Sequence, residues 1–354
     1  MIYVGIDVHK KKCVATLKQE SSQIMQQLTF NNSAEGITAL VNQLDALGEC
    51  KAVLESTGNY WIRIHDTLED NGIDTLLANP VKTKTIAKAK LKNDKTDSNI
   101  LCDLLRADLI YESYVPDGKH RMLRQLVRGR LELVQTRTKH RNRIHAILAK
   151  YNHIAPCQKL FSKQGLEWLR TVELTAVDRL LLDANLQILA TLDNQIELVT
   201  DQVAKLSAED ERVKLLMTIP GIDYYTALVV VSEIVDVNRF ASQWKLVSYA
   251  GLCPTQRDSG SKHWRGQITK EGSRWLRNAV VEAANTARLH DERLGAFYER
   301  IAGRRGPQKA QVATGKEMLC IIWHMLRNNE PYRTMDPQLV EKKYKRLELR
   351  ASMA

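Results

Sequence analysis

Four carboxylates in the N-terminal part of the chain have the residue types and spacing of a divalent-cation site. Asp7 lies inside an apolar run, where an unpaired carboxylate is costly, and Glu55 directly follows another such run. Asp94 and Asp97 are three residues apart, so a helix would place them on one face, although Asp94 alone could equally be a helix N-cap. Oxygen ligands hold Mg²⁺ or Mn²⁺, and two such ions about 4 Å apart suit phosphodiester chemistry. The joint pattern predicts Asp7, Glu55, Asp94 and Asp97 as metal-binding and catalytic residues.

The elements that must position these carboxylates follow a mixed α/β pattern up to about residue 115. Residues 3–8 and 13–17 have the composition of two strands joined by a basic turn. A third strand ends at Glu55, and Ser56-Thr57-Gly58 offers N-cap chemistry for a helix that ends near residue 71. A further strand over residues 73–78 completes a strand, helix, strand crossover.

Two long proline-free segments, over residues 120–152 and 172–206, predict an antiparallel coiled-coil hairpin within residues 116–210. The second segment carries a heptad-like seam of apolar residues: Leu182, Leu186, Leu189, Ile196, Val199, Val203 and Leu206. The first is polar in its middle, at Arg137, His140 and Arg141, which leaves the partner of that stretch open. Such a hairpin would suit assembly into a dimer or tetramer.

Residues 211–354 predict a mainly helical C-terminal domain. Ile219-Pro220-Gly221-Ile222 precedes an apolar helix over residues 226–235, a pattern typical of a helix-hairpin-helix whose turn amides face a phosphate. Asp223 stands where many such turns have a second glycine, which weakens that phosphate-binding interpretation. A polar loop over residues 255–268, a helix from about Ser273 and a basic helical tail from Pro331 follow.

Basic charge is concentrated in two windows. The chain has 52 Lys and Arg against 41 Asp and Glu, a net charge of +11. Residues 81–150 contain 17 basic against 7 acidic residues, and residues 239–309 contain 14 against 6. Such clusters bind nucleic-acid phosphates, although a solvated basic face is the alternative, and a membrane surface is disfavoured because no aromatic face opposes the charge. The predicted nucleic-acid contacts are Lys88, Lys90, Lys92, Arg257, Lys262, Arg265 and Lys270.

Several protein classes are excluded by composition. The apolar fraction of 44% argues against intrinsic disorder. Six scattered cysteines without a Cys-x-x-Cys pair argue against a disulfide framework or a zinc ribbon. No stretch has the length and apolarity of a membrane span, and no leader pattern opens the chain, so we expect a cytoplasmic protein with no membrane partner.

Motifs along nearly the whole chain resemble the DEDD transposases of the IS-one-ten insertion-sequence family. They begin with Gly5-Ile6-Asp7-Val8-His9-Lys10, and the others follow in the family's order: Glu55-Ser56-Thr57-Gly58-Asn59-Tyr60, Asn93-Asp94-Lys95-Thr96-Asp97, Leu104-Leu105-Arg106, Tyr249-Ala250-Gly251-Leu252, Asp258-Ser259-Gly260-Ser261 and Leu276-Arg277. The resemblance implies an RNase H-like domain similar to the RuvC Holliday-junction resolvase over residues 1–115, with Asp7, Glu55, Asp94 and Asp97 as its metal-binding tetrad.

One register of this resemblance has an alternative. The family usually has Lys-Thr-Asp-x-x-Asp, whereas Lys95-Thr96-Asp97 is followed three residues later by Ile100. Aligning on residues 101–106 puts Asp94 and Asp97 in the two acidic places, with Asp103 as the fallback. The family's C-terminal domain uses a serine nucleophile, and the matching residue is Ser259, with Ser261 as its close competitor.

The resemblance implies a transposase that cleaves and rejoins DNA, guided by a noncoding bridge RNA that pairs with donor and target DNA. It also implies a prokaryotic cell, in which the protein would be associated with the nucleoid. Base pairing would then supply specificity, which fits distributed backbone contacts and the lack of a base-reading helix. Two rivals remain: a metal-dependent, structure-selective nuclease that has no need of Ser259, and a nucleic-acid-binding protein without catalysis.

Overall fold

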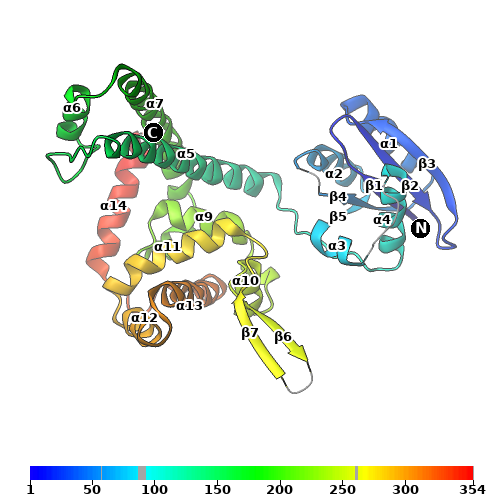
Figure 1. Ribbon diagram of the computed structural model, residues 1–354. Helices are drawn as coiled ribbons and strands as arrows, with labels where there is room; N and C mark the ends of the chain where they lie inside the picture. The colour runs from blue at the N-terminus through cyan, green and yellow to red at the C-terminus, as the bar shows by residue number, and fades with distance from the viewer. Residues whose placement is uncertain (57, 87–92, 260–261, 354) are drawn as a thin grey trace. The chain divides into compact units, whose positions relative to one another are not determined.

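The computed structural model describes residues 1–56, 58–86, 93–259 and 262–353, with the side chains of residues 257–265 left outside the description. The chain forms two compact units, Met1–Val115 and Pro116–Ala354 (Figure 1). Each unit is described by itself below.

The first unit contains a five-stranded sheet in the order β3-β2-β1-β4-β5. β1 pairs antiparallel with β2 and parallel with β4, β2 pairs antiparallel with β3, and β4 pairs parallel with β5. The strands are β1 (Ile2–Asp7), β2 (Lys12–Lys18), β3 (Ile24–Asn31), β4 (Cys50–Glu55) and β5 (Asp74–Ala78).

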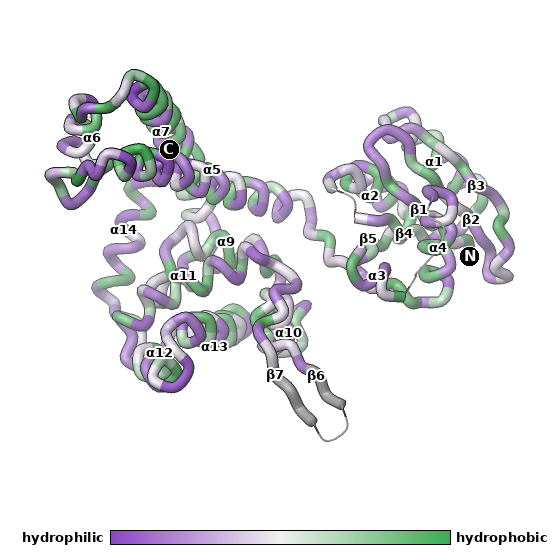
Figure 2. Tube along the Cα trace, in the orientation of Figure 1, coloured by the Kyte–Doolittle hydropathy of each residue, from purple (hydrophilic) through white to green (hydrophobic). Residues whose placement is uncertain are grey.

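Burial along the strands explains this order. β1 and β4 are rich in hydrophobic residues and are largely buried, as strands covered on both faces should be (Figure 2). β3 is mostly exposed and carries polar residues, which suits the edge of the sheet.

Helices cover both faces of the sheet. α1 (Ala34–Asp45) and α2 (Trp61–Asp70) share one core with the β1 side chains Val4 and Ile6. α4 (Asp94–Arg106) lies on the opposite face, where its Leu101 contacts Val53 in a second cluster. The remaining helix is α3 (Pro80–Ile86). The predicted mixed α/β architecture of this part is confirmed.

One local prediction for this unit is wrong. The helix after β4 begins at Trp61, with Tyr60 at the cap position and no side-chain cap hydrogen bond, so Ser56 is not its N-cap. Thr57 lies outside the described residues. A one-turn segment therefore separates Glu55 from α2, which keeps this carboxylate at the free end of its strand.

The second unit is mostly helical, as the sequence predicted. A two-stranded sheet, β6 (Pro254–Ser259) and β7 (Lys262–Ile268), interrupts the helices. The helices are α5 (Gly118–Ala149), α6 (Lys163–Thr171), α7 (Ala176–Ala208), α8 (Glu211–Met217), α9 (Tyr224–Ile234), the 3-10 helix η1 (Val237–Arg239), α10 (Gln243–Tyr249), α11 (Arg274–His290), α12 (Glu292–Arg305), α13 (Pro307–Asn328) and α14 (Pro337–Met353).

α5 and α7 pack together in opposite directions, with α6 in the connection between them (Figure 1). Apolar residues fill their far end, where Ile144 and Leu182 are fully buried. The middle is held by polar pairs, since Arg137 donates to Asp193 at 2.9 Å and Arg130 donates to Thr200 at 2.7 Å. The polar middle of α5 thus has its partner on α7. Coiled-coil packing in the strict sense, and a domain boundary near residue 210, stay predictions.

The predicted helix-hairpin-helix segment corresponds to α8, a short turn and α9. The turn at Gly221 lies against the backbone of α11, because a Cβ there would approach the amide nitrogen of Ala287 to 2.9 Å. Lys343 of α14 donates to the carbonyl oxygens of Met217, Ile219 and Ile222 at 2.7, 2.7 and 2.8 Å. Phosphate binding by this turn stays a prediction, and its visible contacts are with the unit's own helices.

Residues 255–268 differ from the predicted loop. β6 and β7 pair antiparallel, with Arg257 opposite Trp264 and Ser259 opposite Lys262. The sequence over residues 255–268 has few apolar residues and no apolar–polar alternation, so it does not predict a strand.

Within the described residues, no helix combines the length and apolarity that a membrane crossing requires.

Candidate metal centre

Asp7 and Glu55 end two neighbouring parallel strands. Ile6 of β1 pairs with Leu54 of β4, so the next residue on each strand is a carboxylate. Side chains alternate along a strand: Ile6 and Leu54 belong to the core under α1 and α2, and Asp7 and Glu55 therefore face the side covered by α4. The fold thus places two carboxylates side by side at the carboxyl edge of the sheet.

α4 brings two more carboxylates to the same place. Asn93 caps this helix by accepting a hydrogen bond from the Thr96 amide at 2.8 Å, and Asp94 and Asp97 lie in its first turn. Acidic residues are favoured there by the helix dipole. Asp94 is therefore not the N-cap, and its side chain is 58% exposed and free to bind.

Gly5 lets α4 lie close to β1. An ideal Cβ at Gly5 would overlap the Ser98 carbonyl oxygen and approach the Cys102 Cα to 2.9 Å. Any side chain at this position would push the helix, and with it Asp94 and Asp97, away from Asp7. Glycine is thus required here by close approach rather than by an unusual backbone angle.

His9 is a member of this cluster that sequence reasoning missed. Its Nε2 lies 3.2 Å from an Asp7 carboxylate oxygen and 3.4 Å from an Asp94 oxygen. These three residues offer ligand atoms within 4.8 Å of one another. The signal was present in the sequence, because His9 follows Asp7 by two residues and so leaves the strand at the same edge.

The pKa of the Asp7 carboxyl is raised by burial and by the carboxylates around it. Asp7 is 3% exposed, and burial raises the pKa of its carboxyl to about 6. The neighbouring His9 lowers this pKa, whereas the charges of Glu55, Asp94 and Asp97 raise it further. No Lys or Arg of the described ranges forms an ion pair with these four carboxylates. A cluster of carboxylates without a fixed cation is the donor set that a divalent metal would neutralise.

Asp103, the fallback for the fourth acid, has a different environment. It accepts a hydrogen bond from the buried Lys18 at 2.6 Å, and Arg106 lies 4.0 Å away. The charges of Asp94 and Asp97 are among the causes that raise the pKa of Asp7. The geometry therefore favours Asp94 and Asp97 over Asp103.

The other predicted site residues lie largely beyond what the structure describes. Lys88, Lys90, Lys92 and the competitor Ser261 are outside the described residues, as are the side chains of Arg257, Ser259, Lys262 and Arg265. The Ser259 backbone ends β6 in the second unit. Lys270 is exposed in the turn before α11, where its backbone has a φ of 57°.

The base of the β6–β7 ribbon is held by tight backbone contacts. Gly251 and Gly272 have φ values of 66° and 100°, and a Cβ at Gly272 would overlap the Tyr249 carbonyl. Arg277 donates to the Ala250 carbonyl oxygen at 2.8 Å. These contacts hold the backbone at the base of the ribbon that carries Ser259.

A buried carboxylate, Glu233, binds residues close to the base of the ribbon. Glu233 of α9 has no exposed surface and accepts two hydrogen bonds from Arg128 of α5, at 2.9 and 2.6 Å. Ser273, the N-cap residue of α11, donates to the other Glu233 oxygen at 3.0 Å. Glu233 therefore links α5 and α9 to the start of α11, directly after the ribbon.

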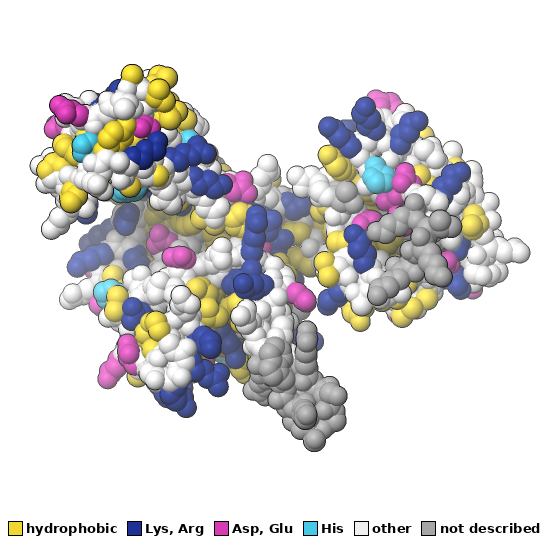
Figure 3. Space-filling model, viewed as in Figure 1, with side chains coloured by type: hydrophobic (Ala, Val, Ile, Leu, Met, Phe, Trp, Pro, Cys, Tyr) yellow, Lys and Arg dark blue, Asp and Glu magenta, His cyan; other side chains and the backbone are white. Residues whose placement is uncertain are grey.

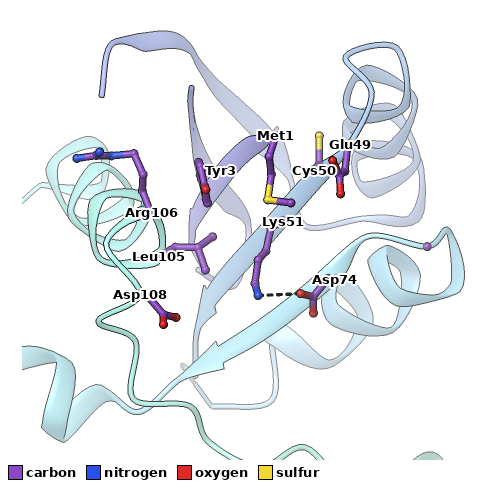
Figure 4. A pocket seen from close by; sticks show the side chains of 10 residues that line it. Met1, Tyr3, Glu49, Cys50, Lys51, Asp74, Leu105, Arg106 and Asp108 are labelled. Carbon is purple, nitrogen blue, oxygen red and sulfur yellow. Dashed lines mark ion pairs between the residues drawn. The ribbon is translucent and has the colours of Figure 1, made fainter. Parts of the chain in front are cut away.

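A cavity of about 400 Å³ lies at the amino ends of β1, β4 and β5, the edge of the sheet opposite to Asp7 and Glu55 (Figure 4). Lys51 and Asp74 form an ion pair of 2.9 Å across it, and Tyr3, Leu105 and Arg106 line it. None of the four predicted metal ligands lines this cavity.

Comparisons with known proteins find two family models that match this chain. Residues 4–153 match a family model described as a transposase of the DEDD IS110 type, and residues 213–299 match the model "Transposase IS116/IS110/IS902 family". The first match contains all four carboxylates, and the second contains the β6–β7 ribbon.

Curated relatives are similar over most of the chain. A putative transposase of Sinorhizobium fredii is 26% identical over 81% of this chain and 72% of its own length. The transposase for insertion sequence element IS1111A of Coxiella burnetii is 27% identical over 79% of each chain. The pilin gene-inverting protein of Moraxella bovis is 25% identical over 93% of this chain and 97% of its own.

Two models of one family therefore match the two units in the order expected, and the relatives extend the similarity between them. The chain belongs to the IS110 family of transposases, enzymes that cleave and rejoin DNA.

Proposed function

We propose that this chain excises and inserts an insertion sequence, using a RuvC-like, RNase H-like domain over residues 1–115 that holds a divalent cation. The observation that carries the proposal is the convergence of Asp7 and Glu55, at the ends of adjacent strands, with Asp94 and Asp97 on the first turn of α4. The four carboxylates come from segments that are far apart in the sequence. At this sheet edge, neutral residues would stabilise the fold better than four clustered carboxylates do.

The four carboxylates fit Mg²⁺ or Mn²⁺. They offer hard oxygen ligands, they lack Lys and Arg partners among the described residues, and burial together with the charges of the other three carboxylates raises the pKa of Asp7. A bound divalent ion would supply Lewis-acid activation of the attacking oxygen and charge neutralisation at the leaving oxygen. The chain's own contribution is to hold the oxygen ligands in place through β1, β4 and the capped first turn of α4.

Ser259 is proposed as the nucleophile. Its Oγ would form a bond to a DNA phosphorus while the bond to the 3′ oxygen breaks, and attack by a second DNA 3′ oxygen would later release the serine. The proposal rests on the family motif and on the position of Ser259 at the end of a ribbon with an anchored base. Ser261 is the alternative nucleophile.

Nucleic-acid binding is proposed to be mainly electrostatic. The net charge of +11 and the two basic windows suit phosphate contacts, with Lys88, Lys90, Lys92, Arg257, Lys262, Arg265 and Lys270 as candidates. Guidance by a bridge RNA is part of the proposal through the family resemblance. Distributed backbone contacts would be sufficient where base pairing selects the site.

A second copy of the chain is the proposed partner of α7. This helix buries one stripe against α5, and a second stripe is exposed at heptad spacing: Val177, Leu181, Ala184, Ile188, Thr191, Gln195 and Leu198. Leu198 is 63% exposed and Val177 is 67% exposed. Repeating steps of four and three residues are typical of a coiled-coil contact. Replacing Leu181 and Ile188 by lysine should reduce the mass measured by light scattering if copies assemble there.

The test of the proposed function follows circular-junction formation from the element's own flanking DNA in cells. The wild-type chain should form junctions, whereas Asp7→Asn, Asp94→Asn and Ser259→Ala should not. Asp108→Asn is the matched control, because Asp108 is exposed, has a φ of 53° that asparagine tolerates, and lies outside the cluster. Junctions from Ser259→Ala would remove the serine from the mechanism, and cleavage without rejoining by the wild type would favour a structure-selective nuclease.

A further inference from the structure

Four cationic side chains gather where α12 ends and α13 begins. Arg300, Arg304, Arg305 and Lys309 are all exposed. In the part of the chain that the structure describes, none of them forms an ion pair with a carboxylate. We call these four residues the α12–α13 basic corner. Figure 3 shows Lys and Arg side chains gathered at the edge of the second unit where α12 lies.

Some other arginines of this unit have carboxylate partners. Arg128 pairs with Glu233 at 2.6 Å, Arg137 with Asp193 at 2.9 Å and Arg293 with Glu317 at 2.9 Å. Those arginines contribute to the fold through their carboxylate partners. The four side chains of the basic corner have no carboxylate partner among the described residues, and Arg304 donates a hydrogen bond to the backbone carbonyl oxygen of Arg300 at 3.3 Å.

Arg304 and Arg305 lie in the last turn of α12, where the helix dipole favours cations, but two other features of the corner are unfavourable for the helices. Arg300 and Arg304 are four residues apart on α12, a spacing at which like charges repel. Lys309 lies in the first turn of α13, where the helix dipole favours acidic residues, and that turn contains none. Gly306 at the N-cap of α13 provides no side-chain hydrogen bond. Where local rules are broken together without a gain in packing, a functional contact is the expected reason.

Gly303 is a further residue that the fold does not explain. It is exposed within α12, a Cβ built on it meets nothing within 4 Å, and its backbone has no positive φ. Alanine would favour the helix more. The missing side chain leaves the helix backbone open between Arg300 and Arg304, which allows a ligand to come close.

We infer that the α12–α13 basic corner binds the phosphate backbone of duplex DNA, an inference that rests on the proposed action on DNA. Clustered cations on two successive helix ends match the sequence-independent negative charge of a duplex. Stacking of unpaired bases is disfavoured, because the aromatic ring next to the corner, Phe297, is already covered by Arg300 at 5.3 Å.

The test measures binding of the full chain to a labelled random-sequence DNA duplex between about 50 and 300 mM salt. A triple variant, Arg300→Gln with Arg304→Gln and Lys309→Gln, should lose at least about tenfold in affinity, and the slope of log affinity against log salt should fall by about 2 to 3. Gly303→Leu should also weaken binding, although it removes no charge. Thermal melting should show that both variants remain folded.

The matched control removes equal charge from another helix of the same unit. Lys342, Lys345 and Arg346 are exposed on α14 beside Glu341 and Glu348. Their replacement by glutamine should leave affinity within about twofold of the wild type. Equal losses of duplex affinity in the control and the corner variant would overturn the inference. A corner variant that loses affinity for a single-stranded RNA and keeps its affinity for the duplex would also overturn it.

Failure of this inference can be separated from failure of the proposed function. Asp7→Asn should bind the duplex as the wild type does, because its defect concerns the reaction. Unchanged binding by the corner variant together with normal junction formation by the wild type would overturn only the inference. If the corner variant binds the duplex more weakly and the wild type never forms junctions, the inference would be supported and the proposed function opposed.

Discussion

Gly5 of β1 and Cys102 of α4 lie so close that a methyl group on Gly5 would approach the Cys102 Cα to 2.9 Å. This contact fixes the distance between the strand that carries Asp7 and the helix that carries Asp94 and Asp97. The geometry of the carboxylate cluster therefore depends on a residue that has no side chain.

Gly5→Ala should abolish junction formation and destabilise the fold by about 1 to 3 kcal/mol, because the helix must move to accept the methyl group. Gly129→Ala is the control, since Gly129 lies within α5 and a Cβ there meets nothing within 4 Å. That variant should gain about 0.5 to 1 kcal/mol in chemical denaturation. Normal activity of Gly5→Ala would show that the helix position is not critical.

Asp7→Asn should stabilise the metal-free protein at neutral pH. The pKa of Asp7 is raised from 3.8 to about 6 in the fold, so the folded state favours the protonated form. The corresponding stability is present below pH 3.8 and is lost as the pH rises through 6. Melting curves of the metal-free wild type and variant should coincide near pH 4 and differ above pH 6, by roughly 1 to 3 kcal/mol. A difference in stability that does not change with pH would contradict the raised pKa of Asp7.

Divalent cations should stabilise the wild type and not Asp7→Asn. Binding to the folded state alone raises stability by about 2.7 kcal/mol at a metal concentration one hundred times Kd. Thermal melting with increasing Mg²⁺ or Mn²⁺ provides the measurement, with Asp108→Asn as the control that should respond like the wild type. An equal response from Asp7→Asn would place the ion elsewhere.

Ser259→Ala should prevent covalent attachment of the protein to DNA. Denaturing electrophoresis of a reaction with labelled DNA should show a slower protein–DNA species for the wild type and not for Ser259→Ala. Ser261→Ala should retain that species. The reverse result would assign the nucleophile to Ser261.

Glu233→Ala should destabilise the chain by about 3 kcal/mol, because Arg128 loses the carboxylate oxygen that accepts two of its hydrogen bonds and Ser273 loses its acceptor. Glu299→Ala is the control, since the Glu299 side chain is 73% exposed and lies 4.0 Å from Arg288. Its effect in chemical denaturation should stay below about 0.5 kcal/mol. Similar effects of the two substitutions would show that the buried network does not support the fold.

Much of the fold could be predicted from local patterns. The strand around Asp7 and the long helices over α5 and α7 follow from apolar runs and from proline-free periodicity. The β6–β7 ribbon could not be predicted, because its sequence lacks the apolar–polar alternation of a half-buried strand. Pairing between strands provides its structure, and pairing is not visible in local hydrophobicity.

The candidate site was predictable in its residue types and less so in its arrangement. Asp7 and Glu55 each follow apolar strands, so their position at strand ends could be expected. The approach of His9 to Asp94 and the engagement of Asp103 by Lys18 depend on how α4 packs on the sheet. This packing depends on the close contacts of Gly5 and its neighbours, which the periodicity of apolar residues does not reveal.

The parallel pairing of β1 with β4 has a consequence for insertions and deletions. Ile6 lies opposite Leu54, and a slip of one residue would turn Glu55 away from Asp7 to the other face of the sheet. Loss of one residue within β4 should thus inactivate the enzyme, whereas the exposed loop between α1 and β4 should tolerate a change of length. The spacing from Asp7 to Glu55 along the chain can therefore drift among relatives, while their pairing across the strands cannot.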